Sequence, residues 1–308
     1  MKWPWQFGST DKRLVMSWAP GELAYVQALA RDDGWSVERL GVERQGQDSE
    51  AAFLKRLQSL GLQDDRAVVV LRPSQYQLLQ IDAPAVEPQE LRAAVRWQIA
   101  GLVDQPLEDL VIDVLPVGDD NVRRTNQLFV VAAEQSVIAR SMALAKDLHV
   151  DVVAIDIQDT AQRNLQLLQL QDQVLEGAHA AIALTDERQA LLTISACGEL
   201  QYTRRLDLEP GVCELDRHHE ERERWGGEIQ RSLDVWDRTA PALHVDRISL
   251  YAGASTQALS RWLGQYLGQA VFPMDLQGSF EGLESHDLQT HSACWPLLGG
   301  LLREHPSH

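Results

Sequence analysis

Two sets of short apolar strand patterns, one in each half of the chain, constrain the fold more than any other feature of the sequence. The first set consists of Arg13 to Ser17, Glu22 to Ala30 and Trp35 to Leu40. The second set consists of Ala180 to Leu184, Leu191 to Ala196 and Glu199 to Leu206. Turns are predicted at Ala19-Pro20-Gly21 and at Cys197-Gly198. A three-stranded β-meander at the start of each half predicts a duplicated α/β structure, although the pattern alone leaves several α/β folds open.

Helical patterns follow the first meander and precede the second. Ser49 can cap a helix whose apolar face contains Ala52, Phe53, Leu57 and Leu60. Asp159 or Thr160 can cap another helix that runs to about Leu175. We expect this second helix to turn Ala161, Leu165 and Leu168 toward the core and to leave its glutamines in solvent. The remaining predicted elements are a strand at Ala67 to Leu71, a helix at Asp216 to Trp236, a strand at Arg247 to Tyr251, and helices at Thr256 to Leu267 and Trp295 to Arg303.

Residues 73–150 have an element order of their own. Strands are predicted at Tyr76 to Ile81, Leu110 to Pro116 and Gln127 to Ala133, and helices at Glu87 to Ala100 and Gln135 to Leu148. The polar loop Gly118 to Asn126 joins the second and third strands. The residues expected to face inward from the two helices are Leu91, Val95, Ile99, Leu102, Val137, Ala143, Leu144 and Leu148. The order β-α-β-β-α describes a compact insert of about 75 residues.

The charge and cysteine content of the chain exclude several classes of protein. The net charge of -17 argues against binding to nucleic acid or to an anionic membrane, because both require clustered Lys and Arg. The three cysteines are widely spaced and odd in number, which favours a reducing compartment. No apolar run approaches the ~20 residues of a spanning helix, and the segment Met1 to Phe7 lacks the apolar core of a signal peptide. We therefore expect a cytoplasmic protein that does not insert into a membrane.

Five segments of the sequence resemble one known family. Four of them, in order, are Glu90-Leu-Arg-Ala-Ala-Val-Arg-Trp-Gln-Ile99, Pro106-Leu-Glu-Asp-Leu-Val-Ile-Asp113, Val130-Val-Ala-Ala-Glu-Gln-Ser-Val137 and Val150-Asp-Val-Val-Ala-Ile-Asp156. The fifth, Gly227-Glu-Ile-Gln-Arg-Ser-Leu-Asp-Val-Trp236 with Val245 to Ser255, is similar to the last nucleotide-pocket segment of the same family. The family is PilM, the actin-like proteins on the cytoplasmic side of type IV pilus machines. The resemblance covers residues 12–303 and is greatest to members from mannose-sensitive haemagglutinin (MSHA) pili.

The resemblance implies an α/β (α+β) fold of the actin-like, ribonuclease-H-like type, with duplicated domains. It places residues 1–72 and 151–178 in the first domain, residues 73–150 in the inserted β-α-β-β-α subdomain, and residues 179–308 in the second domain. Actin-like proteins bind a nucleotide between their two halves, with its phosphates at the turns of the two meanders.

The residues at these turns depart from what phosphate binding requires. The first turn normally reads Asp-x-Gly, since glycine lets backbone N–H groups approach phosphate and the aspartate organises Mg²⁺. By the resemblance, Ser17 replaces that aspartate and Ala19 the glycine. Pro20 removes a backbone donor, and Glu22 adds negative charge where phosphate would lie.

The residues predicted on the other side of the pocket also differ from those of nucleotide-binding relatives. By the resemblance, Thr185 and Glu187 stand where relatives have an aspartate and a glycine, although Arg188 could meet a phosphate. The adenosine-side turn keeps one glycine, Gly253, where relatives have two or three. We therefore expect no catalytic residues, no bound ATP or other cofactor, and no metal; Ser17, Ala19, Thr185, Glu187 and Gly253 mark a degenerate pocket.

Other clusters of reactive side chains carry weaker signals. Cys213 to His219 includes groups that can bind metals, but its spacing fits no standard zinc pattern and favours a solvated helix start. Ser195 lies beside Cys197 in a hairpin without the sequence of a nucleophile elbow, which argues against a hydrolase. His149, His179 and His244 lie at the edges of predicted elements and are expected to be ordinary surface histidines.

The degenerate turns predict a protein without catalytic activity, and the resemblance implies an adaptor on the cytosolic face of the inner membrane. Its partner would be the cytosolic tail of a PilN-like inner-membrane protein, and the complex would couple the assembly platform to the pilus motor. Three alternatives remain open. They are a nucleotide-binding switch of the same fold, a cytoplasmic actin-like component of a type II secretion system, and a metal-dependent enzyme on a ribonuclease-H-like core. The first meander lacks an aspartate that this last alternative requires.

Overall fold

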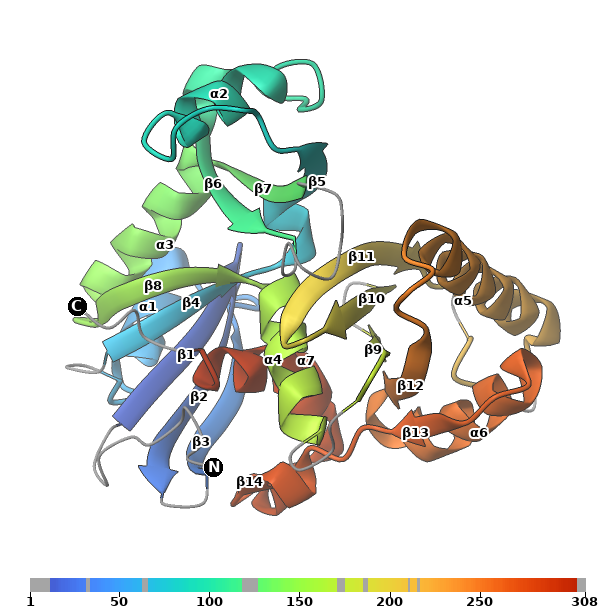
Figure 1. Cartoon of the computed structure of the whole chain (residues 1–308). Helices are drawn as coiled ribbons and strands as arrows, with labels where there is room; N and C mark the ends of the chain where they lie inside the picture. Colours follow the sequence, from blue (N-terminus) through green and yellow to red (C-terminus); the bar gives the residue numbers. More distant parts are fainter. Residues whose placement is uncertain are drawn as a thin grey trace.

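A computed structural model describes residues 12–31, 34–62, 66–117, 127–170, 175–184, 188–209, 211–214 and 217–303. The strands in these ranges form a six-stranded, a five-stranded and a three-stranded sheet (Figure 1). The two larger sheets lie on either side of helices α4 (Gln158–Leu170) and α7 (Leu288–Leu301), and the smallest sheet lies above them in the view of Figure 1. The mixed α/β class predicted from the sequence is confirmed.

The six-stranded sheet has the order β14-β3-β2-β1-β4-β8. Its strands are β1 (Lys12–Ala19), β2 (Glu22–Arg31), β3 (Gly34–Arg44), β4 (Arg66–Leu71), β8 (Asp151–Ile157) and β14 (Phe280–Glu281). The first three form the predicted antiparallel meander, while β4 and β8 continue the sheet in parallel. Helix α1 (Glu50–Gln58) begins at Ser49 as predicted, since the hydroxyl of Ser49 accepts a hydrogen bond from the backbone N–H of Ala52 at 3.3 Å.

The five-stranded sheet has the order β11-β10-β9-β12-β13. Its strands are β9 (Ala178–Leu184), β10 (Gln189–Ala196), β11 (Glu199–Asp207), β12 (Val245–Tyr251) and β13 (Val271–Pro273), and its helices are α5 (His219–Thr239) and α6 (Thr256–Leu267). Cys197 and Gly198 form the turn between β10 and β11 with φ angles of 53° and 84°. Two consecutive positive φ angles are typical of a tight hairpin turn, so the predicted turn is correct.

The insert has its own sheet, in the order β5-β7-β6. Its elements in chain order are β5 (Tyr76–Asp82), α2 (Leu91–Gln98), β6 (Leu110–Pro116), β7 (Gln127–Glu134) and α3 (Gln135–Asp147). Val95 and Ile99 of the α2 region are buried in its core as predicted. Leu102 and Ala143, which were expected to face inward, are exposed instead. In the α3 region Leu148 is buried and Val137 and Leu144 are partly buried, as predicted, while Ser141 and Ala145 are buried without having been predicted.

Three glutamines of α4 are buried, so the prediction that the glutamines of this helix are exposed is wrong for them. Gln158, Gln162 and Gln166 recur every four residues, and all three are buried. The amide of Gln162 donates to the carbonyls of Ala181 and Leu191, and that of Gln166 donates to the carbonyl of His179. These bonds join α4 to strands β9 and β10, so the glutamines attach the helix to the second sheet.

His179 also differs from its prediction as a surface histidine. It lies within β9 with 1% of its surface exposed, and its ring Nε2 is 2.8 Å from the hydroxyl of Ser249. Burial, and then the nearby charge of Arg247, lower the pKa of His179 from 6.5 to about 3. The imidazole is therefore neutral at physiological pH.

Helix α7 joins the two halves of the chain into one core. It begins at Leu288, seven residues before the predicted start at Trp295, and continues through Pro296. Trp295 and Leu298 are fully buried in a cluster that also contains Val15 and Val26 of the first sheet and Ala181 of the second. The early start was not visible in the sequence because Thr290, His291 and Ser292 interrupt the apolar pattern.

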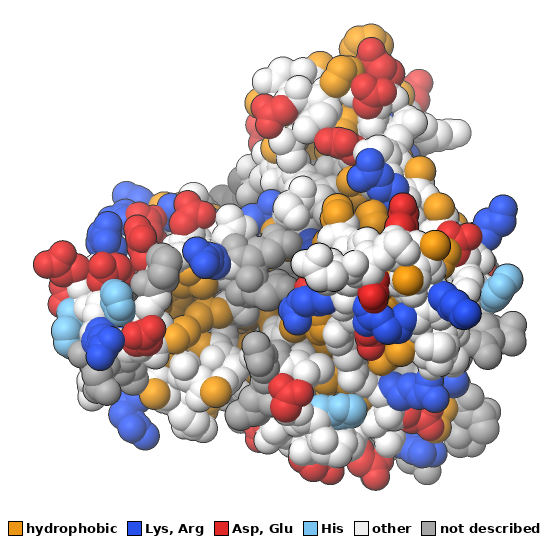
Figure 2. Space-filling view, turned by 180° about the vertical axis from the view of Figure 1, so that it is seen from behind, with side chains coloured by type: hydrophobic (Ala, Val, Ile, Leu, Met, Phe, Trp, Pro, Cys, Tyr) orange, Lys and Arg blue, Asp and Glu red, His pale blue; other side chains and the backbone are white. Residues whose placement is uncertain are grey.

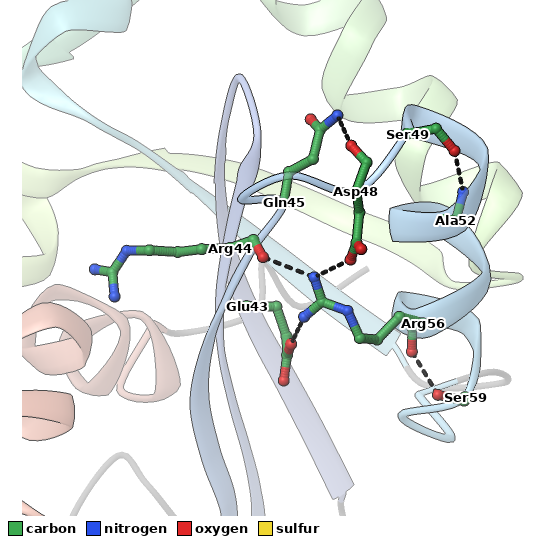
Figure 3. Close-up of polar contacts among 8 residues, drawn as sticks. All are labelled: Glu43, Arg44, Gln45, Asp48, Ser49, Ala52, Arg56 and Ser59. Atoms are coloured by element: carbon green, nitrogen blue, oxygen red, sulfur yellow. Dashed lines mark hydrogen bonds and ion pairs between the residues drawn. The ribbon is translucent and has the colours of Figure 1, made fainter.

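Arg56 of α1 fixes the connection between β3 and α1 (Figure 3). Its guanidinium donates to the carboxylate of Glu43, to the carbonyl of Arg44 at 2.7 Å and to Asp48 at 3.0 Å. The side chain of Arg44 extends away from this cluster in the opposite direction. Arg56 therefore holds the end of β3 in the position from which Arg44 reaches the first meander turn.

Across the described ranges, no helix combines the length and apolarity that a bilayer crossing requires.

Candidate functional site

The first meander turn belongs to the predicted nucleotide site, which we call the cleft, and the charge at this turn is already paired. Glu22 follows the turn, and its carboxylate forms ion pairs with two arginines. Arg72 approaches one oxygen and Arg44 the other, each at 2.7 Å. The Arg72 and Glu22 side chains are only 13% and 17% exposed, so this pair is largely removed from solvent. A cation that could meet a phosphate at this turn is thus held by a carboxylate of the same turn.

A short segment after β4 covers the turn. Arg72 directly follows this strand, and the next residues, Pro73 to Gln75, form a 3₁₀ turn. The amide of Gln75 donates to the carbonyl of Trp18 at 2.8 Å, and its oxygen accepts from the backbone N–H of Arg72 at 2.8 Å. The Arg72 Nε also lies 3.4 Å from the hydroxyl of Ser17. These contacts attach residues 72–75 to the end of β1, on the side where an incoming phosphate would approach.

The space that remains beside Ser17 is small. A cavity of about 20 Å³ is lined by Ser17, Ala24, Val70, Leu71, Arg72, Pro73, Gln158, Ala293, Pro296 and Leu297. That volume holds about one water molecule, whereas ligand pockets are typically about 300–1,000 Å³. Three of the lining residues belong to α7, so the last helix of the chain closes this space from the far side.

The adenosine-side turn is closed by the same helix. Gly253 has a φ of 53°, and a Cβ at this position would lie 2.2 Å from the Ser292 hydroxyl of α7. Ser292 precedes Ala293, which lines the cavity beside Ser17. Consecutive residues of α7 therefore contact the surroundings of two predicted pocket positions, Ser17 and Gly253, and the helix lies between them.

The first strand of the second meander ends against an indole of α7. The Trp295 Nε1–H donates to the carbonyl of Leu184, the last residue of β9, at 3.1 Å. The ring of Tyr251 at the end of β12 lies 6.1 Å from that of Trp295. Burial raises the pKa of Tyr251 to about 12, so its hydroxyl stays protonated. The predicted positions Thr185 and Glu187 follow Leu184 and lie outside the described residues.

A buried polar cluster connects the insert, α4 and the second sheet. The Tyr76 hydroxyl donates to one oxygen of Asp159, and the Thr203 hydroxyl donates to the other at 2.6 Å. Burial, and then the neighbouring carboxylate of Asp159, raise the pKa of Tyr76 well above its usual value. Arg205 of β11 donates to the carbonyl of Pro73 at 2.6 Å. Three separate parts of the chain are thereby fixed relative to one another at the top of the cleft.

Helix α5, which carries the segment that resembles the family's nucleotide pocket, forms an ion pair with the second sheet. Glu228 of α5 lies 2.7 Å from Arg204 of β11, and Arg204 also donates to the Ser232 hydroxyl at 3.1 Å. Arg231 lies beside the same carboxylate and, together with Arg204, holds the pKa of Glu228 below its usual range. Within the described ranges, no three His, Cys, Asp or Glu side chains are grouped closely enough to hold a metal ion.

The chain matches solved structures over nearly its whole length. It superposes on a chain of a PilM–PilN type IV pilus biogenesis complex with a TM-score of 0.71 at 17% identity, covering 95% of this chain and 98% of the other. It superposes on a Bacteroides thetaiotaomicron protein with an actin-like ATPase fold and unknown function with a TM-score of 0.51 at 11% identity, covering 86% and 91%. The chain has an actin-like fold.

A third actin-like neighbour comes from a secretion system. The cytoplasmic domain of EpsL, an inner-membrane component of the type II secretion system of Vibrio cholerae, superposes with a TM-score of 0.53 at 12% identity. The match covers 96% of each chain. No family model matches the sequence, and no curated protein matches it either. Because all three identities are low, these likenesses show the actin-like fold.

Sequence reasoning missed the residues that close the cleft. Arg72 was not singled out. Its position between an apolar strand pattern and Pro73 does predict that it lies at the end of a strand. Asp159 was predicted only as a helix cap, and it instead accepts hydrogen bonds from Tyr76 and Thr203. Ser17 and Gly253 both lie beside α7, and the position of this helix between them was not foreseen.

Replacing Arg72 by alanine is expected to lower the free energy of unfolding by about 1–3 kcal/mol, because Glu22 then keeps only the exposed Arg44. Urea unfolding measures the change. Arg92→Ala is the matched control, since its ion pair with Asp113 has side chains 73% and 60% exposed, and we expect a loss of no more than about 0.5 kcal/mol. Equal losses in the two variants would contradict a structural role for the Arg72–Glu22 pair.

Proposed function

We propose that this protein is a non-catalytic, actin-like adaptor of a type IV pilus assembly platform. Its partner is the cytosolic tail of a PilN-like inner-membrane protein. The likeness to a chain of a PilM–PilN complex over 95% of this chain supports that partner. The adaptor works at the cytosolic face of the inner membrane and reaches the membrane through this partner.

The closed cleft is the observation that carries the non-catalytic part of the proposal. ATP hydrolysis requires room for the nucleotide, a way to organise Mg²⁺ and cationic or N–H groups aimed at the phosphates. Here the cavity beside Ser17 is about 20 Å³, and Arg72 is paired with Glu22. Fold likeness does not supply an activity that the site residues do not support. The protein is in this view a pseudo-ATPase that keeps the fold for its docking surfaces.

The finer assignment is to MshI, the PilM-like protein of MSHA pilus biogenesis. The degenerate turns at Ser17 and Gly253 support it. The adaptor would then couple the PilN-like protein to the motor ATPase of the pilus. The genes that flank this one test the assignment, since an MSHA locus contains the partner and the motor together.

A cytoplasmic component of a type II secretion system is the second candidate. The cytoplasmic domain of EpsL aligns over 96% of both chains, which supports it. The TM-score of 0.53 for that domain is lower than the 0.71 for the pilus complex, which favours the pilus assignment.

Two titrations of the purified protein test the proposal. In the first, a fluorescent peptide with the tail sequence of the PilN-like protein encoded beside this gene is expected to bind and to saturate. In the second, calorimetry with Mg-ATP, with ADP as a control, is expected to give no binding heat under conditions that detect a Kd of ~100 μM, about -5.5 kcal/mol. A scrambled tail peptide controls for non-specific binding.

The two titrations fail independently. A saturating Mg-ATP curve would contradict the pseudo-ATPase assignment and would favour a nucleotide switch. Absence of tail binding, with the scrambled and native peptides alike, would contradict the adaptor function whatever the result with nucleotide.

A further inference from the structure

The outer surface of α2 carries an aromatic side chain that the fold does not use. Trp97 is 78% exposed, the highest value among the exposed large apolar residues of the described chain. Ala93 lies one turn before it on the same side of the helix, and Ala100 and Gly101 lie in the turn that follows; all three are exposed. We call these four residues, Ala93, Trp97, Ala100 and Gly101, the α2 outer face.

The core of the insert does not need this face. Val95 and Ile99 lie on the opposite side of the helix and are fully buried against the insert's own sheet. α2 lies at the outer end of the insert, on the far side from α4 and α7 (Figure 1). Exposed tryptophan is uncommon on a soluble surface and is enriched at the centres of protein interfaces. The α2 outer face is therefore an unpartnered apolar surface at an extremity of the molecule.

Acidic residues flank this face on both sides. Glu87 and Glu90 are exposed just before α2, and Asp104 is exposed after it. Among the described residues, none of the three carboxylates has an ion pair, and Asp104 accepts a hydrogen bond from the side-chain amide of Gln77 at 3.0 Å. The two arginines of the helix are engaged elsewhere: Arg92 pairs with Asp113 at 2.9 Å, and Arg96 donates to the backbone carbonyl of Leu107. In Figure 2 hydrophobic and acidic side chains lie next to each other at the upper end of the molecule, where the insert is.

This charge pattern selects among the possible occupants. An anionic membrane surface would be repelled by the acidic flanks. A second copy of this chain would bring the same acidic residues together, and like-charge contacts across an interface are unfavourable. A segment whose apolar side chains are flanked by Lys or Arg matches both the tryptophan and the carboxylates.

We propose that the α2 outer face docks an amphipathic helix of a partner protein, with apolar side chains on Trp97 and with Lys or Arg beside Glu87, Glu90 and Asp104. The site goes beyond the tail-binding function proposed above and does not depend on it. The eight residues of α2 span about 12 Å, so the contact involves about two helical turns and is weak and reversible.

A model peptide tests this site in the full-length protein. The probe is a fluorescein-labelled, 18-residue amphipathic helix of Leu and Lys, and the comparison peptide has Glu in place of every Lys. Fluorescence anisotropy is expected to show saturable binding of the Lys peptide only. Trp97→Ser is expected to weaken that binding at least tenfold, which corresponds to about 1.4 kcal/mol. The double variant Glu87→Lys/Glu90→Lys is expected to weaken it at least fivefold.

Tyr266→Ser is the matched control, since Tyr266 is another exposed aromatic, 43% exposed, on α6 of the second domain. It is expected to leave the affinity for the Lys peptide unchanged. Equal affinity of Trp97→Ser and the unmodified protein, or equal binding of the Lys and Glu peptides, would overturn the proposal.

Two further outcomes would also overturn it. One is binding of the protein to vesicles of anionic lipid that Trp97→Ser abolishes, and the other is a monomer–dimer equilibrium that the same substitution abolishes. Titration of Trp97→Ser with the PilN-like tail keeps the two functions apart. We expect this variant to bind the tail normally. Loss of tail binding would show that the α2 outer face and the tail site are not separate.

Discussion

Trp295→Ala is expected to lower the free energy of unfolding by about 3–5 kcal/mol, because it removes a fully buried indole from the core that the two larger sheets share. The substitution also leaves the carbonyl of Leu184 without its indole donor and removes the neighbour of Tyr251. Urea unfolding followed by circular dichroism measures the loss. Because the contacts of α7 to both sheets are weakened together, we also expect the single transition to broaden or to separate into two.

Two variants bracket this result. Trp295→Phe keeps a buried aromatic ring but loses the indole N–H and part of the ring volume, so a loss of about 1–2 kcal/mol is expected. Trp97→Ala removes an indole that is 78% exposed, and its effect is expected to stay within about 0.5 kcal/mol. A loss below about 1 kcal/mol for Trp295→Ala would show that α7 does not hold the two sheets together.

Acidification from pH 6.5 to pH 3 is expected to remove up to about 5 kcal/mol of stability through His179 alone, since its pKa falls from 6.5 in the unfolded chain to about 3 in the folded protein. Between these two values the unfolded chain binds a proton that the folded chain excludes. Stability is therefore complete above pH 6.5 and declines as the pH falls toward 3. Burial is the main cause, and the positive charge of Arg247 adds to it.

The measurement is the free energy of unfolding in urea at several pH values for the unmodified protein and for His179→Gln. Glutamine does not titrate, so the variant is expected to lose less stability over this window, even if it is less stable at pH 7. The carboxylates contribute equally to both proteins and cancel in the comparison. Parallel curves for the two proteins would contradict a neutral, buried His179.

The sequence indicated the meanders because their signals are local. Alternating apolar residues and a two-residue turn such as Cys197-Gly198 act within a few positions of the chain. The cap at Ser49 and the burial of Val95 and Ile99 were predicted for the same reason. At the cleft, Ser17 and Gly253 could be chosen because the family resemblance carried their positions.

What the sequence did not reveal depends on distant partners. Gln162 and Gln166 read as a solvated helix face, since a glutamine is normally exposed. They are buried because strands β9 and β10, reached only in the fold, offer backbone carbonyls as acceptors. His179 was misjudged for the same reason, because its partner Ser249 lies 70 residues away.

The short strands show another limit. β13 and β14 have three and two residues, and no periodic pattern can develop over such lengths. They exist because an edge strand is already present for each to pair with: β12 for β13 and β3 for β14. Arg72 was likewise placed by a tertiary ion pair with Glu22, a contact between residues 50 positions apart.

The position of α7 in the chain has a consequence for biosynthesis. The first sheet is completed by β14, which pairs with β3 through Phe280 and Trp35, and its apolar face is covered by α7. These pieces leave the ribosome about 250 residues apart, a delay of roughly 10–50 s at about 5–20 residues per second. During that interval the face of the first sheet that packs on Trp295 lacks the cover that α7 provides. A chain that is truncated before α7 is therefore expected to be a client for chaperones rather than an independent domain.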